Sequence, residues 1–326
     1  MNQIFKSGYI CHPDQLYSVR RLTYAEGRAK GMDIIEICTA DGLQLDLLPD
    51  TGLDIGQVRY KGKNITFISK NGYVGTAAIN PYEQEFLNTF PGGLLYTCGL
   101  RTTGGPHRDG NEWQTQHGRY HSLCAQPVSI KEEDACIVVT GILRETALFG
   151  YNLQVVRTIR IPIMGADVNV SDAITNLAFQ DEEYALLYHC NFGYPLISEM
   201  AHLELPDERI TTPRTPFAAA GLGKETTFGV PVPKEEERVF FHEKMEHKAS
   251  IVNETLHIRV DMTWSENLPI LAHWRSMASG DYVCALEPTN CYIMGRKYER
   301  DNGTLPVLKA FETVNTEVTF HFETLF

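Results

Sequence analysis

The chain has 326 residues, of which 43% are hydrophobic and 21% are charged, and its formal net charge is −12. This composition is typical of a globular protein and excludes an intrinsically disordered chain. The acidic balance argues against a nucleic-acid partner, because binding to a polyanion draws on clustered Lys and Arg, so a small neutral ligand fits better.

The N-terminal segment, Met1–Lys6, has no basic start followed by an apolar stretch, and no run approaches the length of about 18 apolar residues that a membrane helix needs. The eight cysteines include no Cys-x-x-Cys pair and no spacing of a zinc site or disulfide framework. We interpret them as buried, reduced thiols. A cytoplasmic protein without membrane contact is expected.

Local patterns predict the first elements. The segment Asp14–Arg21 is readable as a short helix or as a strand. Asp41-Gly42 lies between the apolar runs 34–39 and 43–48. Because both central positions of a two-residue hairpin loop need positive φ, this dipeptide predicts a β-hairpin.

Alternation of apolar and polar residues is the dominant pattern further along the chain, in the ranges 151–155, 168–171, 256–264 and 317–323. A period of two is typical of antiparallel strands with one buried face. No segment shows a long apolar stripe with helical spacing between helix caps. The chain is therefore predicted to be all-β, with packed sheets in one domain covering residues 1–326.

The pattern changes between Glu199 and Ser250, where five prolines interrupt it and Lys234–Arg238 forms a charged run. We interpret this segment as loops over one sheet face and the charged run as a solvated turn. No linker, tandem repeat or low-complexity tract is evident.

Two apolar segments far apart in the chain each contain one titratable group. His189 lies within Leu187–Gly193, and Glu287 lies within Ala285–Thr289. An imidazole facing a carboxylate can move a proton in both directions near neutral pH. The spacing alone does not distinguish such a pair from two groups with structural hydrogen bonds.

A second group of candidates surrounds His117. His117, Arg119 and His121 occupy alternate positions, so a strand would place all three side chains on one face, which either lines a pocket or forms a polar outer surface. Further along, Trp274 offers an apolar plate on which a sugar face can stack, although indoles more often pack in a core.

Several short motifs resemble those of the aldose 1-epimerases, or galactose mutarotases. In chain order, the resemblance rests on His117-Gly118 (a His-Gly pair), Tyr188–Phe192 (the segment of the general acid) and Leu286–Pro288 (the segment of the general base). Features typical of a divergent, DUF4432-type branch lie at Gly52–Gly56, Pro91–Leu94, Thr97–Leu100 and Asn191–Leu196. The resemblance implies a large antiparallel β-supersandwich with few short helices.

The resemblance also implies an activity and a set of roles. Glu287 is expected as the base that removes the proton of the anomeric hydroxyl, and His189 as the acid that protonates the ring oxygen. Proximity in a polar pocket would favour an ionised Glu287 and a protonated His189. The expected substrate-binding residues are His117, Arg119, Asn191, Trp274 and Arg101.

Departures from the family leave the substrate open. Mutarotases carry an Arg before the His-Gly pair and an Asp between acid and base; Arg101 is a possible stand-in for the Arg, and the Asp has no evident counterpart. A modified, acidic or deoxy sugar, or reaction at another carbon, therefore remains possible.

Two other classes of protein remain open. A metal-dependent, cupin-type sugar isomerase would use His117 and His121 as ligands, although a third ligand is missing. A non-catalytic carbohydrate-binding protein is compatible with the same fold. A polysaccharide lyase is more remote. No glycine-rich phosphate loop is present, so we expect no cofactor and, for the favoured mechanism, no metal. The expected partner is a small sugar, and the expected state is a monomer or homodimer.

Overall fold

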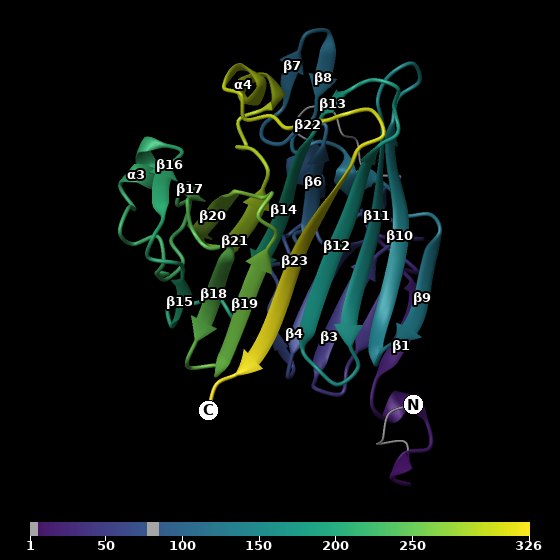
Figure 1. The fold of residues 1–326 in the computed structure, drawn as a ribbon. Coiled ribbons are helices and arrows are strands. Elements are labelled where there is room, and N and C mark those ends of the chain that lie inside the picture. Colours follow the sequence, from purple (N-terminus) through teal and green to yellow (C-terminus); the bar gives the residue numbers. More distant parts are fainter. Residues whose placement is uncertain (1–5, 77–84) are drawn as a thin grey trace.

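The computed structural model of the chain describes residues 6–76 and 85–326. Within these ranges, antiparallel sheets make up most of the molecule (Figure 1). The largest sheet has eight strands, in the spatial order β15 (Ala201–Glu204), β18 (Lys248–Asn253), β19 (Ile258–Trp264), β23 (Thr313–Thr324), β12 (Asp167–Asn176), β11 (Asn152–Pro162), β10 (Cys136–Thr146) and β9 (Val128–Glu133).

Two further large sheets pack against it. One has six strands, in the order β16 (Ile210–Pro213), β17 (Arg238–Glu243), β20 (Ile270–Ala278), β21 (Asp281–Thr289), β14 (Ala185–Phe192) and β6 (Tyr96–Leu100). The other has five, in the order β1 (Ser18–Thr23), β2 (Asp33–Cys38), β3 (Leu43–Leu48), β4 (Asp54–Tyr60) and β5 (Lys63–Asn64).

Short elements complete the described part of the chain. Two small ribbons pair β7 (His107–Asp109) with β8 (Glu112–Gln114) and β13 (Glu182–Glu183) with β22 (Val307–Leu308). The helices are α2 (Glu85–Thr89), α3 (Pro216–Ala219) and α4 (Arg296–Asp301), with 3-10 turns η1 (Pro13–Gln15) and η3 (Tyr120–Ser122). The predicted all-β architecture with few short helices is confirmed.

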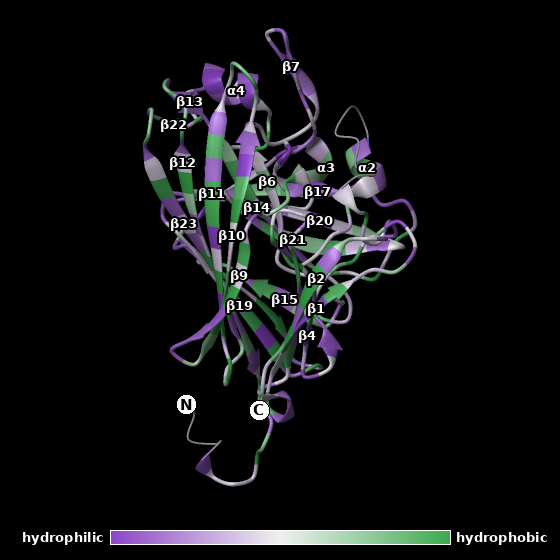
Figure 2. Cartoon of the chain, turned by 90° about the vertical axis from the view of Figure 1, so that its right-hand side faces the viewer, coloured by the Kyte–Doolittle hydropathy of each residue, from purple (hydrophilic) through white to green (hydrophobic). Residues whose placement is uncertain are grey.

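One hydrophobic core lies between the eight-stranded sheet on one side and the six-stranded and five-stranded sheets on the other. It contains Ile35 of β2, Tyr188 of β14 and Phe320 of β23, all at most 1% exposed. Figure 2 shows hydrophobic and hydrophilic bands alternating along β10 and β11. This is the pattern of a sheet with one face in a core and the other in solvent.

The alternating segments form strands as predicted. In β19, Val260 and Met262 are buried while Thr263 is exposed, and β23 shows the same alternation. Asp41-Gly42 joins β2 to β3 in an antiparallel hairpin. The ambiguous segment 14–21 divides between η1 and β1.

The interpretation of residues 199–250 as loops is wrong in part. This segment contains β15, β16, α3 and β17 and begins β18. The strands are short, and β17 is buried on both faces, so neither length nor alternation distinguishes them in the sequence. Because β17 belongs to the six-stranded sheet, the segment contributes to the surface on which the candidate site lies.

A buried ionic network connects all three large sheets behind this surface. Arg157 of β11 is fully buried and donates to Asp172 at 2.7 and 2.8 Å and to Asp54. Thr97 of β6 donates to Asp54 at 2.6 Å, and Tyr188 of β14 donates to Asp172 at 2.7 Å. Breaking such a network leaves an uncompensated buried charge, so it should contribute strongly to stability.

All eight cysteines are free thiols, as expected, but they are not all buried, since Cys11 and Cys124 are exposed. None of the helices in the described ranges combines the length and the apolar content that a membrane span requires.

Candidate active site

Neighbouring strands place His189 and Glu287 opposite each other. The strands β14 and β21 are antiparallel and pair Cys190 with Leu286, so the adjacent positions His189 and Glu287 face each other in the same register. Side chains directly opposite in an antiparallel pair lie on the same sheet face, with Cβ atoms about 5 Å apart. The fold thus brings together two groups that are remote in the sequence.

The two side chains touch and line one cavity. His189 Nε2 lies 3.1 Å from Glu287 Oε1. Their cavity, called here the His189 cavity, has a volume of about 300 Å³, at the lower end of the range for small-ligand pockets. The described residues that line it are Phe86, Leu87, Phe90, Gly104, Gly105, Gln116, His117, His189, Arg214, Glu237, Val239, Trp274, Glu287 and Ile293.

Burial shifts both titratable groups toward their uncharged forms. It lowers the pKa of His189 to about 3, with His117 acting in the same direction. It raises the pKa of Glu287 to about 8, although Arg214 opposes the shift. These directions oppose the expected charged pair, because desolvation is the largest cause of both shifts. Between these pKa values the pair still holds one proton, the same number as a charged His–Glu pair.

His117 lies in the same cavity with a defined tautomer. Its backbone has a φ of 57° and donates to the carbonyl of Gly104 at 2.8 Å. The backbone N–H of Gly104 donates to His117 Nδ1 at 3.3 Å, so Nδ1 accepts and Nε2 carries the proton. Burial lowers the pKa of His117 to about 4, so the ring is a neutral N–H donor at pH 7.

The predicted strand through His117, Arg119 and His121 is wrong. His117 and Gly118 both have positive φ, which makes a turn, and η3 follows directly. Arg119 is therefore separated from His117 and His121, which both pack on the ring of Phe86. His117 lines the His189 cavity, Arg119 lines a second cavity, and His121 is buried in a stack on Tyr96, with 5.0 Å between ring centroids.

The second cavity, called here the Arg119 cavity, has a volume of about 240 Å³. The described residues that line it are Arg101, Glu112, Trp113, Gln114, Thr115, Gly118, Arg119, Glu145 and Tyr151. It lies on the other side of the 114–119 segment from the His189 cavity, because Gln116 and His117 line one and Gln114, Gly118 and Arg119 line the other.

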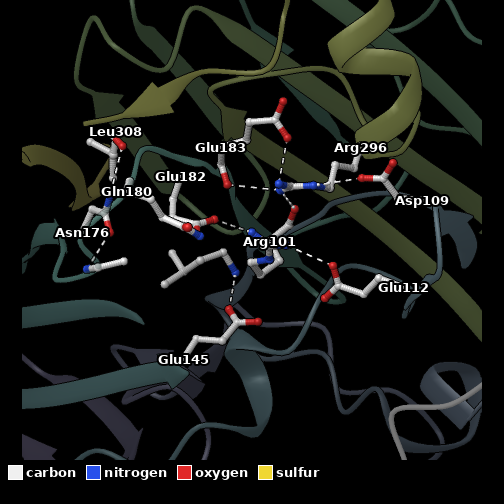
Figure 3. A network of polar contacts seen from close by, with 12 residues as sticks. Arg101, Asp109, Glu112, Glu145, Asn176, Gln180, Glu182, Glu183, Arg296 and Leu308 are labelled. Carbon is white, nitrogen blue, oxygen red and sulfur yellow. Dashed lines mark hydrogen bonds and ion pairs between the residues drawn. The ribbon is translucent and has the colours of Figure 1, made fainter. Parts of the chain in front are cut away.

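Arg101 belongs to the Arg119 cavity and not to the His189 cavity. Figure 3 shows its guanidinium between Glu182 and Glu112, at 2.7 and 3.0 Å. The hypothesis that Arg101 replaces the sugar-binding Arg of the mutarotases is not supported, since its two terminal nitrogens donate to carboxylates of the chain itself and it does not line the His189 cavity. Arg119 likewise does not line the cavity of the His189–Glu287 pair.

Asn191 supports the pair from behind. It is fully buried and does not line the His189 cavity. Its Nδ2 donates to the carbonyls of Gly93 at 3.0 Å and His189 at 2.9 Å, and its side chain raises the pKa of His189 against the effect of burial. Asn191 is therefore a buried neighbour of His189 and not one of the residues that line the cavity, where a sugar contact was expected.

Trp274 lines the His189 cavity together with a charged pair that the sequence did not indicate. Its ring is perpendicular to His189, with 5.5 Å between centroids, and its Nε1–H donates to Glu237 Oε2 at 2.7 Å. Glu237 Oε1 in turn pairs with Arg214 at 2.8 Å. The charged run 234–238 meets solvent at Glu237, as interpreted, since 49% of that side chain is exposed, but Glu237 also lines the cavity.

The layered antiparallel sheets define the chain as a galactose mutarotase-like β-sandwich, with a His–Glu pair in a cavity on its six-stranded sheet. Residues 29–322 match the family described as Domain of unknown function (DUF4432), and the chain belongs to that family. No curated protein matches the sequence significantly.

Solved structures share this fold across almost the whole chain. A candidate aldose 1-epimerase from Klebsiella pneumoniae is 23% identical, with a TM-score of 0.87 over 94% of this chain and 83% of that one. A galactose mutarotase-like protein from Clostridium acetobutylicum is 14% identical, with a TM-score of 0.66 over 95% and 100%. The galactose 1-epimerase from Lactobacillus acidophilus is 15% identical, with a TM-score of 0.63 over 95% and 99%. At these identities the similarity shows the fold.

Proposed function

We propose that the protein is an aldose 1-epimerase, which interconverts the α and β anomers of a sugar without a cofactor. The observation that carries this proposal is the 3.1 Å contact between His189 Nε2 and Glu287 Oε1 inside a cavity of monosaccharide size. The two oxygens that exchange protons in this reaction are bonded to the same carbon. A pair of adjacent proton carriers therefore suits them.

The reaction needs one proton removed and one supplied. Glu287 takes the proton of the anomeric hydroxyl while His189 protonates the ring oxygen, so the bond between the anomeric carbon and the ring oxygen breaks and an aldehyde forms. Rotation of the aldehyde exposes its other face. On closure, the protonated Glu287 returns its proton to the aldehyde oxygen and the neutral His189 accepts the proton of the attacking hydroxyl.

The resting state of the pair fits this cycle. Neutral His189 with protonated Glu287 is the state that ring opening leaves behind. The charged state differs from it by one proton moved from Glu287 to His189, which needs the two groups, 3.1 Å apart without a hydrogen bond, to align. The two forms hold the same number of protons, so they share one pH dependence. Glu287 as base and His189 as acid therefore remain compatible with the pKa shifts.

The remaining polar groups of the cavity are suited to a neutral sugar. His117 offers an N–H donor, Trp274 an apolar face, and Arg214 with Glu237 a paired donor and acceptor. Glu237 lies between His189 and Glu287 in the chain, as the substrate-binding Asp of the mutarotases does. Because Arg214 and Glu237 compensate each other, an anionic sugar would bring an additional uncompensated charge.

The pH dependence of anomer exchange tests the proposal. Measured by saturation-transfer NMR with the uncatalysed rate subtracted, kcat/KM should be constant in the neutral range and fall about tenfold per pH unit above about pH 8, where the pair loses its proton. The rate should also decline toward pH 3, where protonation of His189 adds a second proton to the pair. A rate that rises through pH 8 to an alkaline plateau would contradict the one-proton pair.

The metal-dependent alternative still lacks a third ligand. His117 and His121 both pack on Phe86, but residues 6–76 and 85–326 contain no group of three His, Cys, Asp or Glu side chains placed to hold a metal ion. A non-catalytic sugar-binding protein would show sugar binding without faster anomer exchange in the same NMR experiment.

A further inference from the structure

His189 and Asn191 each have one buried polar atom without a partner. Within residues 6–76 and 85–326, neither His189 Nδ1 nor Asn191 Oδ1 has a hydrogen-bond partner, and both atoms are inaccessible to solvent. The two residues are 5% and 0% exposed. A buried polar atom without a partner is unfavourable, so native proteins contain few of them. Two such atoms on neighbouring side chains therefore need an explanation.

The two side chains are neighbours on one face of β14. Residues two positions apart in a strand point to the same side of the sheet, so Asn191 lies beside His189 on the face that carries Glu287. The amide of Asn191 also reaches back toward its neighbour, because its Nδ2 donates to the backbone carbonyl of His189 at 2.9 Å. The imidazole and the amide are thus adjacent groups of one strand.

The hydrogen bonds of Asn191 determine which end of its amide can serve the imidazole. Nδ2 carries two N–H groups, and these donate to the carbonyls of Gly93 at 3.0 Å and His189 at 2.9 Å. With both donors occupied, Oδ1 is the atom left for the ring. The Asn191 side chain raises the pKa of His189, which is the effect of an acceptor beside an imidazolium, whereas a donor would lower that pKa.

The rings packed around His189 offer its Nδ1 no acceptor. Their centroids lie at 5.3 Å for Phe90, 5.5 Å for Trp274 and 6.0 Å for His117. Phe90 has no polar atom, and the nitrogen of Trp274 is an N–H donor. The acceptor nitrogen of His117 is occupied by the backbone N–H of Gly104. Among these neighbours, the amide oxygen is therefore the acceptor available to Nδ1.

We propose that Asn191 is a positioning residue that holds a proton on His189 Nδ1, through an Nδ1–H···Oδ1 hydrogen bond, so that Nε2 exchanges protons with the substrate. Neutral His189 then presents a lone pair at Nε2, 3.1 Å from Glu287 Oε1. This lone pair accepts the proton of Glu287 or, on ring closure, that of the attacking hydroxyl. The opposite tautomer would place an N–H at Nε2 and two acceptors against each other at Oδ1.

The tautomer of His189 can be measured without any assay of activity. The chain contains 11 histidines, and in ¹⁵N-histidine-labelled protein the ring signals of His189 are those that His189→Asn removes. At pH 7, Nδ1 should have the ¹⁵N shift of a protonated ring nitrogen, and Nε2 that of an unprotonated one. The opposite assignment in the unmodified chain would overturn the proposal.

Two substitutions separate the acceptor of Asn191 from its donors. Asn191→Leu removes both, so His189 should lose its preference for a proton on Nδ1. The kcat for anomer exchange should then fall about tenfold or more with little change in KM, the effect of losing one hydrogen bond to a group that becomes charged. Asn191→Asp loses the donors but keeps an oxygen in the same place, so it should keep the tautomer. If both variants changed the tautomer alike, or neither did, the amide oxygen would not hold the proton.

Asn253→Leu is the matched control. Asn253 of β18 is 1% exposed, its Nδ2 donates to the carbonyl of Leu196 at 2.9 Å, and it does not line the His189 cavity. Its replacement should leave the tautomer of His189 and kcat unchanged; changes as large as those in Asn191→Leu would contradict a specific role of Asn191. The inference rests on the proposed function for the use of Nε2. An Nδ1–H tautomer without faster anomer exchange would reject that function and leave the position of the proton established.

Discussion

Replacement of Glu287 by Gln, or of His189 by Asn, should lower kcat/KM for anomer exchange about 10²–10⁴-fold, the usual contribution of a general acid or base. Glu287→Gln keeps the size of the side chain and His189→Asn keeps a shorter polar one, and both remove the ability to carry the proton. Because the two groups act as one pair, the double variant should lose little more than either single variant. Saturation-transfer NMR on a neutral aldose measures all three rates.

A matched control is available on the surface of the protein. His202 and Glu204 of β15 form another His–Glu pair, at 3.6 Å, but His202 is only half-buried, Glu204 is exposed, and neither lines the His189 cavity. The variants His202→Asn and Glu204→Gln should therefore retain the rate of the unmodified chain. Near-normal rates in Glu287→Gln and His189→Asn, with folded protein, would reject the proposed roles.

Replacement of Arg157 by Met should reduce the free energy of unfolding by about 3–5 kcal/mol. The substitution leaves Asp54 and Asp172 buried without their cation, and both belong to the network that joins the three large sheets. Chemical unfolding followed by tryptophan fluorescence and by far-UV circular dichroism measures the change. The rate of anomer exchange should also fall, because Tyr188, which donates to Asp172 in this network, is the chain neighbour of His189.

The control for this prediction lies on the same strand. Arg160 of β11 forms an ion pair with Glu133 at 3.8 Å, and both side chains are exposed. Because exposed ion pairs contribute little to stability, Arg160→Met should leave the unfolding transition almost unchanged. If Arg157→Met were as stable as Arg160→Met, the buried network would not hold the sheets together.

Much of the fold was predictable because one-sided burial leaves a pattern in the sequence. The strands β19 and β23 alternate since one face contacts the core and the other meets solvent. The same reasoning fails for β17, which is covered on both faces, and for β16, which is short and ends at Pro213. Alternation in the sequence therefore predicts strands that are buried on one face and misses strands that are short or buried on both faces.

The candidate site was predictable only for the groups that lie on such strands. His189 and Glu287 stand out as polar groups in apolar segments, and their motifs resemble those of a known family. Arg214 follows the end of β16, and Glu237 precedes the start of β17. Charged residues at such positions usually meet solvent, so only tertiary contacts reveal that these two line the cavity. For His117, Gly118 was the available signal, because a glycine inside an apparent strand often marks a turn or bulge.

The central claim is that His189 and Glu287 face one sugar-sized cavity and exchange protons with two oxygens of the same anomeric carbon. A crystal structure of the Glu287→Gln variant with a bound aldose tests it most directly. The account predicts that the anomeric oxygen lies within hydrogen-bond distance of residue 287 and the ring oxygen within that distance of His189 Nε2. A sugar bound only in the Arg119 cavity, or with another carbon at the pair, would contradict it.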